Sequence, residues 1–407
     1  MPQDGRGWTL ARLPTGNRSW YHHRNGIHHS RAECRVAVTN GPSGAVSGRR
    51  SIAHVTDLDP DLDDFIEALP KVELHVHLVG SASPRTVLEL ATRYDDHRLP
   101  RTEDGLREFY EFRDFPHFIE VYEEVNDVVR EPEDVADLVV GAARDLASQN
   151  ARYVELTVTP YSHVRSTEAR RGMSMPAVTE ALDHAARHAE ELGVRLGYVF
   201  DIDGLLGEPA ARATLEHAVE HPPEALVGFG LGGMESARPE HREIFRVAFG
   251  DAVAAGLHSV PHAGETTGPE SIWEALDGLG AERIGHGIRC LDDPRLVDRL
   301  RAGRVPLEVC PTSNLRTRQV DRIEDHPFPK LIAEGLVVTL NSDDPPMFGT
   351  TLTNEFRIAA HTFGLGTAEL ADLSRTAVRS SFLDAVGKQE ILAEINAVEA
   401  QRADGDD

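Results

Sequence analysis

Four side chains of the types that bind metal ions stand at three places along this sequence. His75 and His77 are two residues apart, His262 ends a short apolar run, and Asp343 is the first acid of a pair. Imidazole nitrogens and a carboxylate oxygen suit zinc, which keeps one position open for water in catalytic sites. Zinc bound in this way makes hydroxide available near neutral pH. The pattern therefore predicts a hydrolytic site with one Zn²⁺ per chain.

Three further side chains are candidates for proton transfer beside such a metal. Glu265 lies three residues after a predicted ligand, His286 stands between two glycines, and Asp344 is the second acid of the pair. Carboxyl and imidazole groups are common general acids and bases. We expect His286 and Asp344 to orient a water molecule and move its proton, and Glu265 to donate a proton across the pocket. A glycine-rich turn that ends at Gly233 would let a flat ligand approach the backbone closely.

These residues need a scaffold that brings distant strand ends together. Each lies at the end of a short apolar or β-branched run, and eight such runs alternate with helical segments. The predicted strands are 72–77, 153–159, 194–201, 226–231, 258–262, 283–287, 306–310 and 337–341. This alternation predicts an α/β fold, a (β/α)8 TIM barrel with its active site at the C-terminal ends of the strands. An open doubly wound sheet is the alternative, but no glycine-rich phosphate turn follows the first strand.

Composition limits the class of protein. A chain of 407 residues with 40% hydrophobic residues can bury one large core, and its net charge of −25 argues against nucleic acids and anionic membranes as partners. No apolar run approaches the roughly 18 residues of a membrane span, and the N-terminus lacks the apolar core of a signal peptide. Three cysteines without close spacing suit a reducing compartment. We expect a soluble cytoplasmic enzyme with a small-molecule substrate, and the oligomeric state stays open.

The sequence divides into three parts. Residues 1–56 are predicted to be a disordered basic extension, because the first 55 hold eight arginines, five histidines and only two acids, a local charge of +6. Residues 57–395 carry the regular pattern of strands and helices and are predicted to form the barrel. Residues 396–407 are predicted to form an acidic C-terminal tail.

Five motifs together resemble the adenosine deaminase family of metal-dependent barrel hydrolases, over roughly residues 65–390. They are Glu73-Leu74-His75-Val76-His77-Leu78, His262-Ala263-Gly264-Glu265, Gly285-His286-Gly287, Cys310-Pro311-Thr312-Ser313-Asn314 and Ser342-Asp343-Asp344-Pro345. The resemblance implies Zn²⁺ bound by His75, His77, His262 and Asp343. It implies that Glu265 protonates N1 of an adenine ring and that His286 and Asp344 handle the water. Asp344 would also contact N7, and the Gly233 amide N3. The H-x-E…P-C-x-x-C signature of the other zinc deaminases is absent.

Two departures from the family pattern concern the substrate. Adenosine deaminases usually carry Asp or Glu two residues after the second histidine, where it holds the ribose 5′-hydroxyl, and this chain has Val79. A hydroxyl left unpaired on burial costs on the order of 1–3 kcal/mol, so we expect the 5′ end of the ligand to be substituted. The family's usual turn Asp-Leu-x-Gly-Asp-Glu reads Gly-Leu-Gly-Gly-Met-Glu at 230–235.

Segments 77–84, 159–162, 231–233 and 266–270 resemble the actinobacterial branch that acts on 6-amino-6-deoxyfutalosine. That compound is an adenine nucleoside of menaquinone synthesis whose 5′ carbon carries a benzoate-bearing chain. The resemblance implies hydrolysis at C6 with release of ammonia, and Arg85 is the cation expected for the benzoate. The alternative is an adenosine or deoxyadenosine deaminase of purine salvage. An amide- or ester-hydrolysing barrel would not need a proton donor such as Glu265.

Overall fold

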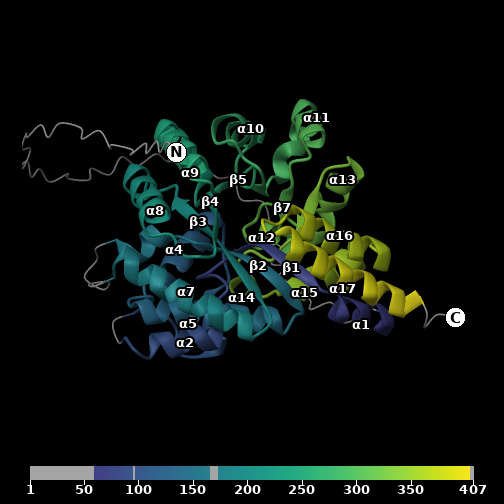
Figure 1. Cartoon of the computed structure of the whole chain (residues 1–407), viewed down its shortest axis with the longest axis horizontal. Coiled ribbons are helices and arrows are strands. Elements are labelled where there is room, and N and C mark those ends of the chain that lie inside the picture. Colours follow the sequence, from purple (N-terminus) through teal and green to yellow (C-terminus); the bar gives the residue numbers. More distant parts are fainter. Residues whose placement is uncertain (1–58, 95–96, 166–172, 404–407) are drawn as a thin grey trace, which may run out of the picture. The chain divides into compact units, whose positions relative to one another are not determined.

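Eight parallel strands form one sheet in which each strand pairs with the next along the chain. The computed structural model describes residues 59–94, 97–165 and 173–403 (Figure 1). The strands are β1 (Lys71–His77), β2 (Ala151–Val158), β3 (Arg195–Asp203), β4 (Leu226–Gly232), β5 (His258–Ala263), β6 (Ile284–His286), β7 (Leu307–Val309) and β8 (Val338–Leu340). Each overlaps one predicted strand, and the predicted (β/α)8 barrel is confirmed.

The seam between β8 and β1 is held by a few specific contacts rather than by a continuous ladder. A single parallel bridge joins Val76 to Asp343. The Asp343 backbone donates to the His75 carbonyl and accepts from the His77 amide, both at 2.9 Å. Two residues before Asp343 in the chain, Asn341 accepts a hydrogen bond at its Oδ1 from the backbone amide of Leu74 in β1, at 3.1 Å. The barrel therefore closes at the point where three predicted metal ligands lie.

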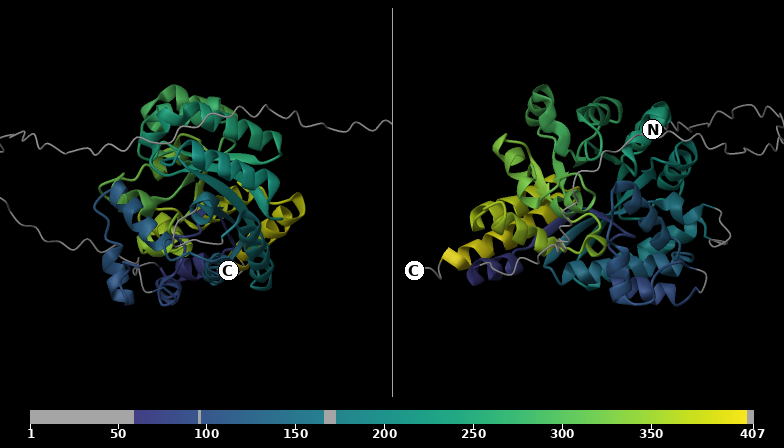
Figure 2. Two further views of the ribbon diagram at one scale, coloured as in Figure 1. Left: turned by 90° about the vertical axis from the view of Figure 1, so that its left-hand side faces the viewer. Right: turned by 180° about the vertical axis from the view of Figure 1, so that it is seen from behind.

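Helices connect the strands and surround the barrel (Figures 1 and 2). They are α1 (Pro60–Ala68), α2 (Pro84–Ala91), α3 (Glu103–Phe109), α4 (Phe115–Asn126), α5 (Pro132–Ala147), α6 (Pro160–Val164), α7 (Met175–Glu191), α8 (Glu208–Glu220), α9 (Arg242–Ala254), α10 (Pro269–Gly278), α11 (Pro294–Gly303), α12 (Pro311–Arg316), α13 (Phe328–Ala333), α14 (Pro345–Phe348), α15 (Leu352–His361), α16 (Thr367–Ser380) and α17 (Ala385–Ala403). Many begin with proline, whose fixed φ and missing N–H suit the first helical turn. Ser83 and Asp293 cap two of these starts by accepting a backbone N–H.

The connection between β1 and β2 is much longer than the others and contains α2, α3, α4 and α5. Its helix α4 packs aromatic rings together, with the Phe118 ring 5.3 Å from that of Phe112 and 5.1 Å from that of Phe348, which follows β8. These contacts anchor α4 to the end of the barrel where the strands finish. The long connection thus supplies a wall to the site.

The structure revises one predicted boundary. Helix α17 continues to Ala403, and the Arg375 side chain donates to Asn396 at 3.0 Å and pairs with Glu399. The acidic tail predicted from residue 396 is therefore helical over its first part, because these side chains tie it to α16. The predicted basic extension, 1–56, and residues 404–407 lie outside the described residues. Among the helices that the structure describes, none has the length and apolar character needed to cross a membrane.

Candidate active site

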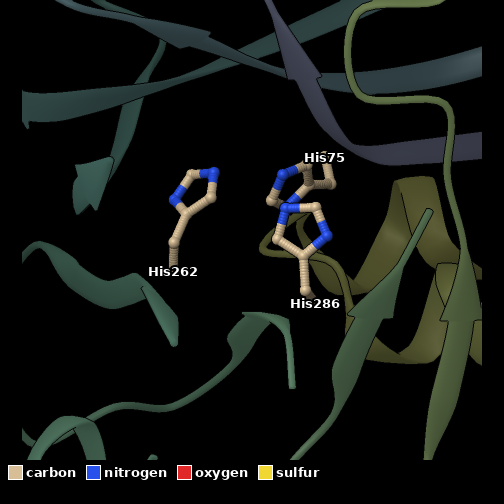
Figure 3. A group of neighbouring side chains, drawn as sticks. All are labelled: His75, His262 and His286. Carbon is tan, nitrogen blue, oxygen red and sulfur yellow. The ribbon is translucent and has the colours of Figure 1, made fainter. Parts of the chain in front are cut away.

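The ends of β1, β5 and β8 bring the four predicted metal ligands together. His77 Nε2 lies 3.1 Å from His262 Nε2 and 3.2 Å from Asp343 Oδ1, and His75 Nε2 lies 3.5 Å from the same oxygen. Figure 3 shows His75 and His262 gathered with His286 between these strand ends, and one nitrogen of each ring lies within 4.8 Å of the others. Residues that are 268 positions apart at the extremes thus share one place.

Three of the six separations within this set are close to those that a metal ion would impose on its ligands. Tetrahedral bonds of about 2.0–2.1 Å place the ligand atoms roughly 3.3–3.4 Å apart, close to the observed distances of 3.1, 3.2 and 3.5 Å. His75 Nε2 is also buried without a hydrogen-bond partner in the structure. Buried polar atoms are nearly always satisfied, so this one calls for a ligand. Groups of these side chains, such as His75, His77 and Asp343, therefore have the types and the spacing that could hold a metal ion.

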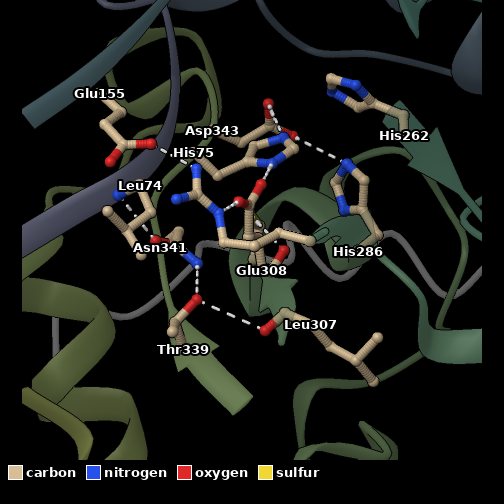
Figure 4. A network of polar contacts seen from close by, with 12 residues as sticks. Leu74, His75, Glu155, His262, His286, Leu307, Glu308, Thr339, Asn341 and Asp343 are labelled. Carbon is tan, nitrogen blue, oxygen red and sulfur yellow. Dashed lines mark hydrogen bonds and ion pairs between the residues drawn. The ribbon is translucent and has the colours of Figure 1, made fainter. Parts of the chain in front are cut away.

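A chain of buried charges orients the ring of His75 (Figure 4). Its Nδ1 donates to Glu308 at 2.9 Å. Arg283 donates to the same Glu308 at 2.5 Å and also forms an ion pair with Glu155. Burial alone would raise the pKa of Glu308, but the charge of Arg283 holds it below its ordinary value. A carboxylate on Nδ1 fixes the tautomer that leaves Nε2 free for a metal. Sequence reasoning missed these residues, although a lone charge inside an apolar strand was the available signal.

Backbone conformation aims Asp343 and His286 into the site. Their φ values are 64° and 61°, in the left-handed region that residues other than glycine seldom adopt. Ser313 Oγ donates to Asp343 Oδ2 at 2.6 Å and holds the carboxylate in this position. Strained residues of this kind concentrate at functional sites, where surrounding contacts enforce them. The short β6 and the tight turn after β8 therefore have a role in placing side chains.

A relay of hydrogen bonds sets the tautomer of His286. His326 Nε2 donates to the side-chain oxygen Oδ1 of Asn314 at 3.1 Å. The side-chain Nδ2 of Asn314 then donates to His286 Nδ1 at 3.3 Å. The proton of His286 is thereby assigned to Nε2, which lies 3.7 Å from Asp343 Oδ2 and 3.8 Å from Glu265 Oε2. Burial lowers the pKa of His286 to about 3. In this tautomer the neutral ring presents an N–H donor to the cavity, and its acceptor nitrogen Nδ1 is occupied by Asn314.

The turn after β5 presents Glu265 as an acid. Glu235 accepts the backbone N–H groups of Gly264, Glu265 and Thr266 at 3.1, 2.8 and 3.1 Å. Glu265 itself is buried, and burial followed by the charge of Asp343 raises its pKa well above the ordinary value. A carboxyl group that stays protonated near neutral pH can donate a proton to a ligand. The Glu235 contacts hold the turn that places it.

Asp344 and Gly233 lie on the wall of the same cavity. Burial and the neighbouring Asp343 raise the pKa of Asp344 well above its ordinary value, and its Oδ1 has no hydrogen-bond partner. A Cβ at Gly80 would lie 1.5 Å from that oxygen, so only glycine there leaves room for the carboxyl group. Gly233 has φ 74° just past β4. Both residues predicted to contact the purine ring therefore line the cavity.

The cavity has a volume of about 220 Å³ and two kinds of wall. The strand ends contribute the polar part, His77, Asp201, His262, Glu265, His286, Asp343 and Asp344. Helix α4 and the segment after β3 contribute an apolar part, Phe115, Phe118, Ile119, Tyr122, Leu205 and Leu206. Arg165, directly after α6, also lies on this wall. A ligand with a polar ring at one end and an apolar substituent matches this division.

Two residues predicted to contact the substrate lie elsewhere. Val79 is buried in the hydrophobic core and does not line the cavity. Arg85, on α2, has an 81% exposed side chain that pairs with Glu89 at 2.8 Å. Its nearness to β1 in sequence was misleading, because the residue lies on the solvent face of its helix. Neither side chain is therefore placed to contact a substrate bound in this cavity.

Asp201, on β3, is a neighbour of His262 that sequence reasoning missed. Its Oδ2 lies 3.7 Å from His262 Nδ1, and burial raises its pKa to about 7. A Cβ at Gly230 would lie only 1.9 Å from Asp201 Oδ1. The glycine that stands where the family usually has aspartate therefore makes room for a carboxyl group from the adjacent strand. Only the three-dimensional pairing of β3 with β4 reveals this exchange.

Comparison with known proteins agrees with the motifs and the geometry. Residues 70–398 match the family profile described as adenosine deaminase. Two relatives named aminodeoxyfutalosine deaminase come from Streptomyces coelicolor, 49% identical over 88% of this chain and 94% of the relative, and Streptomyces avermitilis, 50% identical over 84% and 94%. The solved adenine deaminase of Arthrobacter aurescens is 32% identical with a TM-score of 0.76, covering 81% of this chain and 98% of the other. The chain belongs to the adenosine deaminase family.

Proposed function

We propose that this protein is a zinc-dependent deaminase of 6-amino-6-deoxyfutalosine, an adenine nucleoside with a substituted 5′ carbon. One observation carries the proposal. A site with a metal-ligand set and a buried acid belongs to a chain that is about half identical, over most of its length, to two relatives named for this reaction. The mixed polar and apolar cavity supports a nucleoside that carries an apolar arm.

Zinc is the ion that best matches the donors. Three imidazole nitrogens and one carboxylate oxygen, from His75, His77, His262 and Asp343, are a common set for catalytic zinc. The ion would supply a nucleophile by lowering the pKa of a water molecule toward neutrality. Glu308 and Asp201 would fix the two imidazoles that they face.

The remaining residues would handle the purine ring and the protons. Glu265 donates a proton to N1 as water adds to C6. The proton on N1 makes C6 more electrophilic and so favours the addition. His286 orients the water through its Nε2–H, Asp344 takes up the water's proton, and the amide of Gly233 faces N3. The proton taken from the water then passes to the exocyclic amino group, the C6–N bond breaks and ammonia leaves. Glu265 regains a proton from the C6 hydroxyl, and the ring remains as a hypoxanthine. The raised pKa of Glu265 supports its role as the donor.

The decisive experiment compares nucleosides on the purified protein. Its zinc content is measured, and kcat/KM is determined for 6-aminodeoxyfutalosine, adenosine and adenine from the ultraviolet change as the ring becomes a hypoxanthine. We expect 6-aminodeoxyfutalosine to be preferred to adenosine by at least about tenfold. Equal efficiency with adenosine would instead support a deaminase of purine salvage. Preference for free adenine would support the activity for which the Arthrobacter protein is named.

We also propose that the enzyme works in the cytoplasm on small molecules and not on nucleic acid or membrane surfaces. The net charge of −25 supports this, because it repels polyanions and anionic lipids. Cytoplasmic fractionation of the native protein is the corresponding measurement.

A further inference from the structure

We infer that Arg165 binds an anionic group at the far end of the 5′ substituent, and that an aromatic ring of this substituent packs against α4. The inference deepens the proposed function and rests on it. The part of the cavity wall that would bind this substituent is the arm subsite, which consists of Arg165, Phe115, Phe118, Ile119 and Tyr122. Arg165 is thus assigned as a residue that determines which adenine nucleoside the site accepts.

The apolar part of the arm subsite has no task in deaminating the purine. Glu265, Asp344 and Gly233 already offer polar groups for the ring, whereas four α4 side chains present hydrocarbon to the cavity. Their rings pack with each other, since the centroid of Phe118 lies 5.8 Å from that of Phe115 and 5.9 Å from that of Tyr122. Aromatic side chains in such tilted and edge arrangements accept a further ring readily. A substituent with an aromatic group would bury apolar area here.

Arg165 supplies the charge that an anionic substituent would need. Among the described residues on this cavity wall it is the only lysine or arginine. Its side chain is 26% exposed, and Nη2 donates to Glu123 at 2.8 Å. Its Nε is buried and has no hydrogen-bond partner. The guanidinium has more donors than the one that Glu123 accepts, and these can bind a second carboxylate.

The surrounding acids restrict where an anion can bind. Glu123, Asp201 and Asp203 also line the cavity, and they repel a carboxylate that does not reach Arg165. Burial raises the pKa of Asp203 above its ordinary value. The arm subsite thus favours a ligand whose negative group is placed at the guanidinium, at the end of a ring-bearing arm.

Arg85 provides a matched control. It is the cation that sequence proximity suggested, but it is largely exposed and paired with Glu89. Replacing it removes the same charge from the same protein without touching the cavity. A difference between variants at positions 165 and 85 therefore reports on the subsite and not on net charge.

The test uses Arg165→Gln, Arg165→Lys and Arg85→Gln with three nucleosides. These are 6-aminodeoxyfutalosine, the neutral derivative in which its benzoate carboxylate is a methyl ester, and adenosine. Each is measured as a substrate or as a competitive inhibitor. We expect Arg165→Gln to lower kcat/KM for the acid by about 10- to 100-fold, mainly through KM, while adenosine changes by less than about threefold. Arg165→Lys should recover only part of the loss, because it lacks the planar fork. Arg85→Gln should match the wild type.

The ratio of acid to ester decides the inference. The wild type should favour the acid, and Arg165→Gln should treat acid and ester alike. If Arg165→Gln weakens acid, ester and adenosine equally, its role is structural and the inference is overturned. The result is also overturned if Arg85→Gln has the larger effect. The wild-type preference for 6-aminodeoxyfutalosine over adenosine tests the proposed function separately, so the two can fail independently. Zinc content and melting temperature confirm that each variant is folded.

Discussion

Single residues in this site have protonation states that their buried neighbours determine. Glu265 and Asp344 are carboxyl groups whose pKa values burial raises, whereas Glu308 is kept charged by Arg283. In the proposed function, similar side chains therefore serve as a proton donor, a partner for water and a fixed anion behind a metal ligand. The difference comes from what each group contacts, since all three are carboxyl groups in the same barrel.

Replacing Glu265 with Gln tests its role as the donor. The amide preserves size and hydrogen-bonding capacity but cannot deliver a proton, so we expect kcat to fall by about 10²–10⁴. Zinc content, measured by elemental analysis, should remain at the wild-type level, because Glu265 is not among the ligands. Turnover near that of the wild type would rule out the assignment.

Replacing Glu308 with Gln tests the support of His75. A neutral amide accepts the Nδ1 proton more weakly, and loss of such a partner typically lowers metal affinity by about 10- to 100-fold. The measurement is the zinc dissociation constant in competition with a chromophoric chelator, which does not depend on activity. Glu89→Gln, on the exposed face of α2, is the control. Unchanged affinity in Glu308→Gln would show that the contact at 2.9 Å has no such function.

At the level of elements, the sequence predicted the eight strands and their closure into a barrel, but not the contacts that hold the seam. Hydrophobic runs bounded by turn residues located all eight strands, because a buried parallel strand must be apolar. The seam depends on individual contacts such as Asn341 with the Leu74 amide, which are 267 residues apart. No periodic pattern encodes such a pair. Arg165 and Arg85 make the same point, since only folding shows which of the two reaches the cavity.

Replacing Asn341 with Ala tests the seam. The change leaves the Leu74 N–H buried without its partner at 3.1 Å, which costs about 1–3 kcal/mol. We expect the free energy of unfolding in urea to fall by this amount, and zinc binding to weaken because Asp343 lies two residues further on. Gln401→Ala, at an exposed position of α17, should change stability by less than about 0.5 kcal/mol. Equal losses in the two variants would contradict a special role for the seam.

At the scale of the whole molecule, the metal site and the closure of the barrel share the same residues. His75 and His77 end the first strand, and Asp343 joins the eighth strand to it through backbone hydrogen bonds of 2.9 Å. An ion bound by all three would therefore connect the first and last strands of the barrel. A ligand that binds only the folded state stabilises it by RT ln(1 + L/Kd), where L is the free ligand concentration. Activity and stability should consequently depend on the same ion.

Removing zinc therefore should lower the melting temperature as well as the activity. Binding at about 100-fold above the dissociation constant contributes about 2.7 kcal/mol, enough to shift the melting temperature by several degrees. Calorimetry of the protein with and without a chelator, followed by readdition of zinc, measures the shift. Asp343→Ala should bind zinc weakly, and its melting temperature should respond little to either treatment, since a three-ligand remnant holds the ion poorly. If chelation abolishes activity but leaves the wild-type melting temperature unchanged, the ion does not stabilise the closed barrel. Stoichiometric zinc in Asp343→Ala would remove this residue from the ligand set.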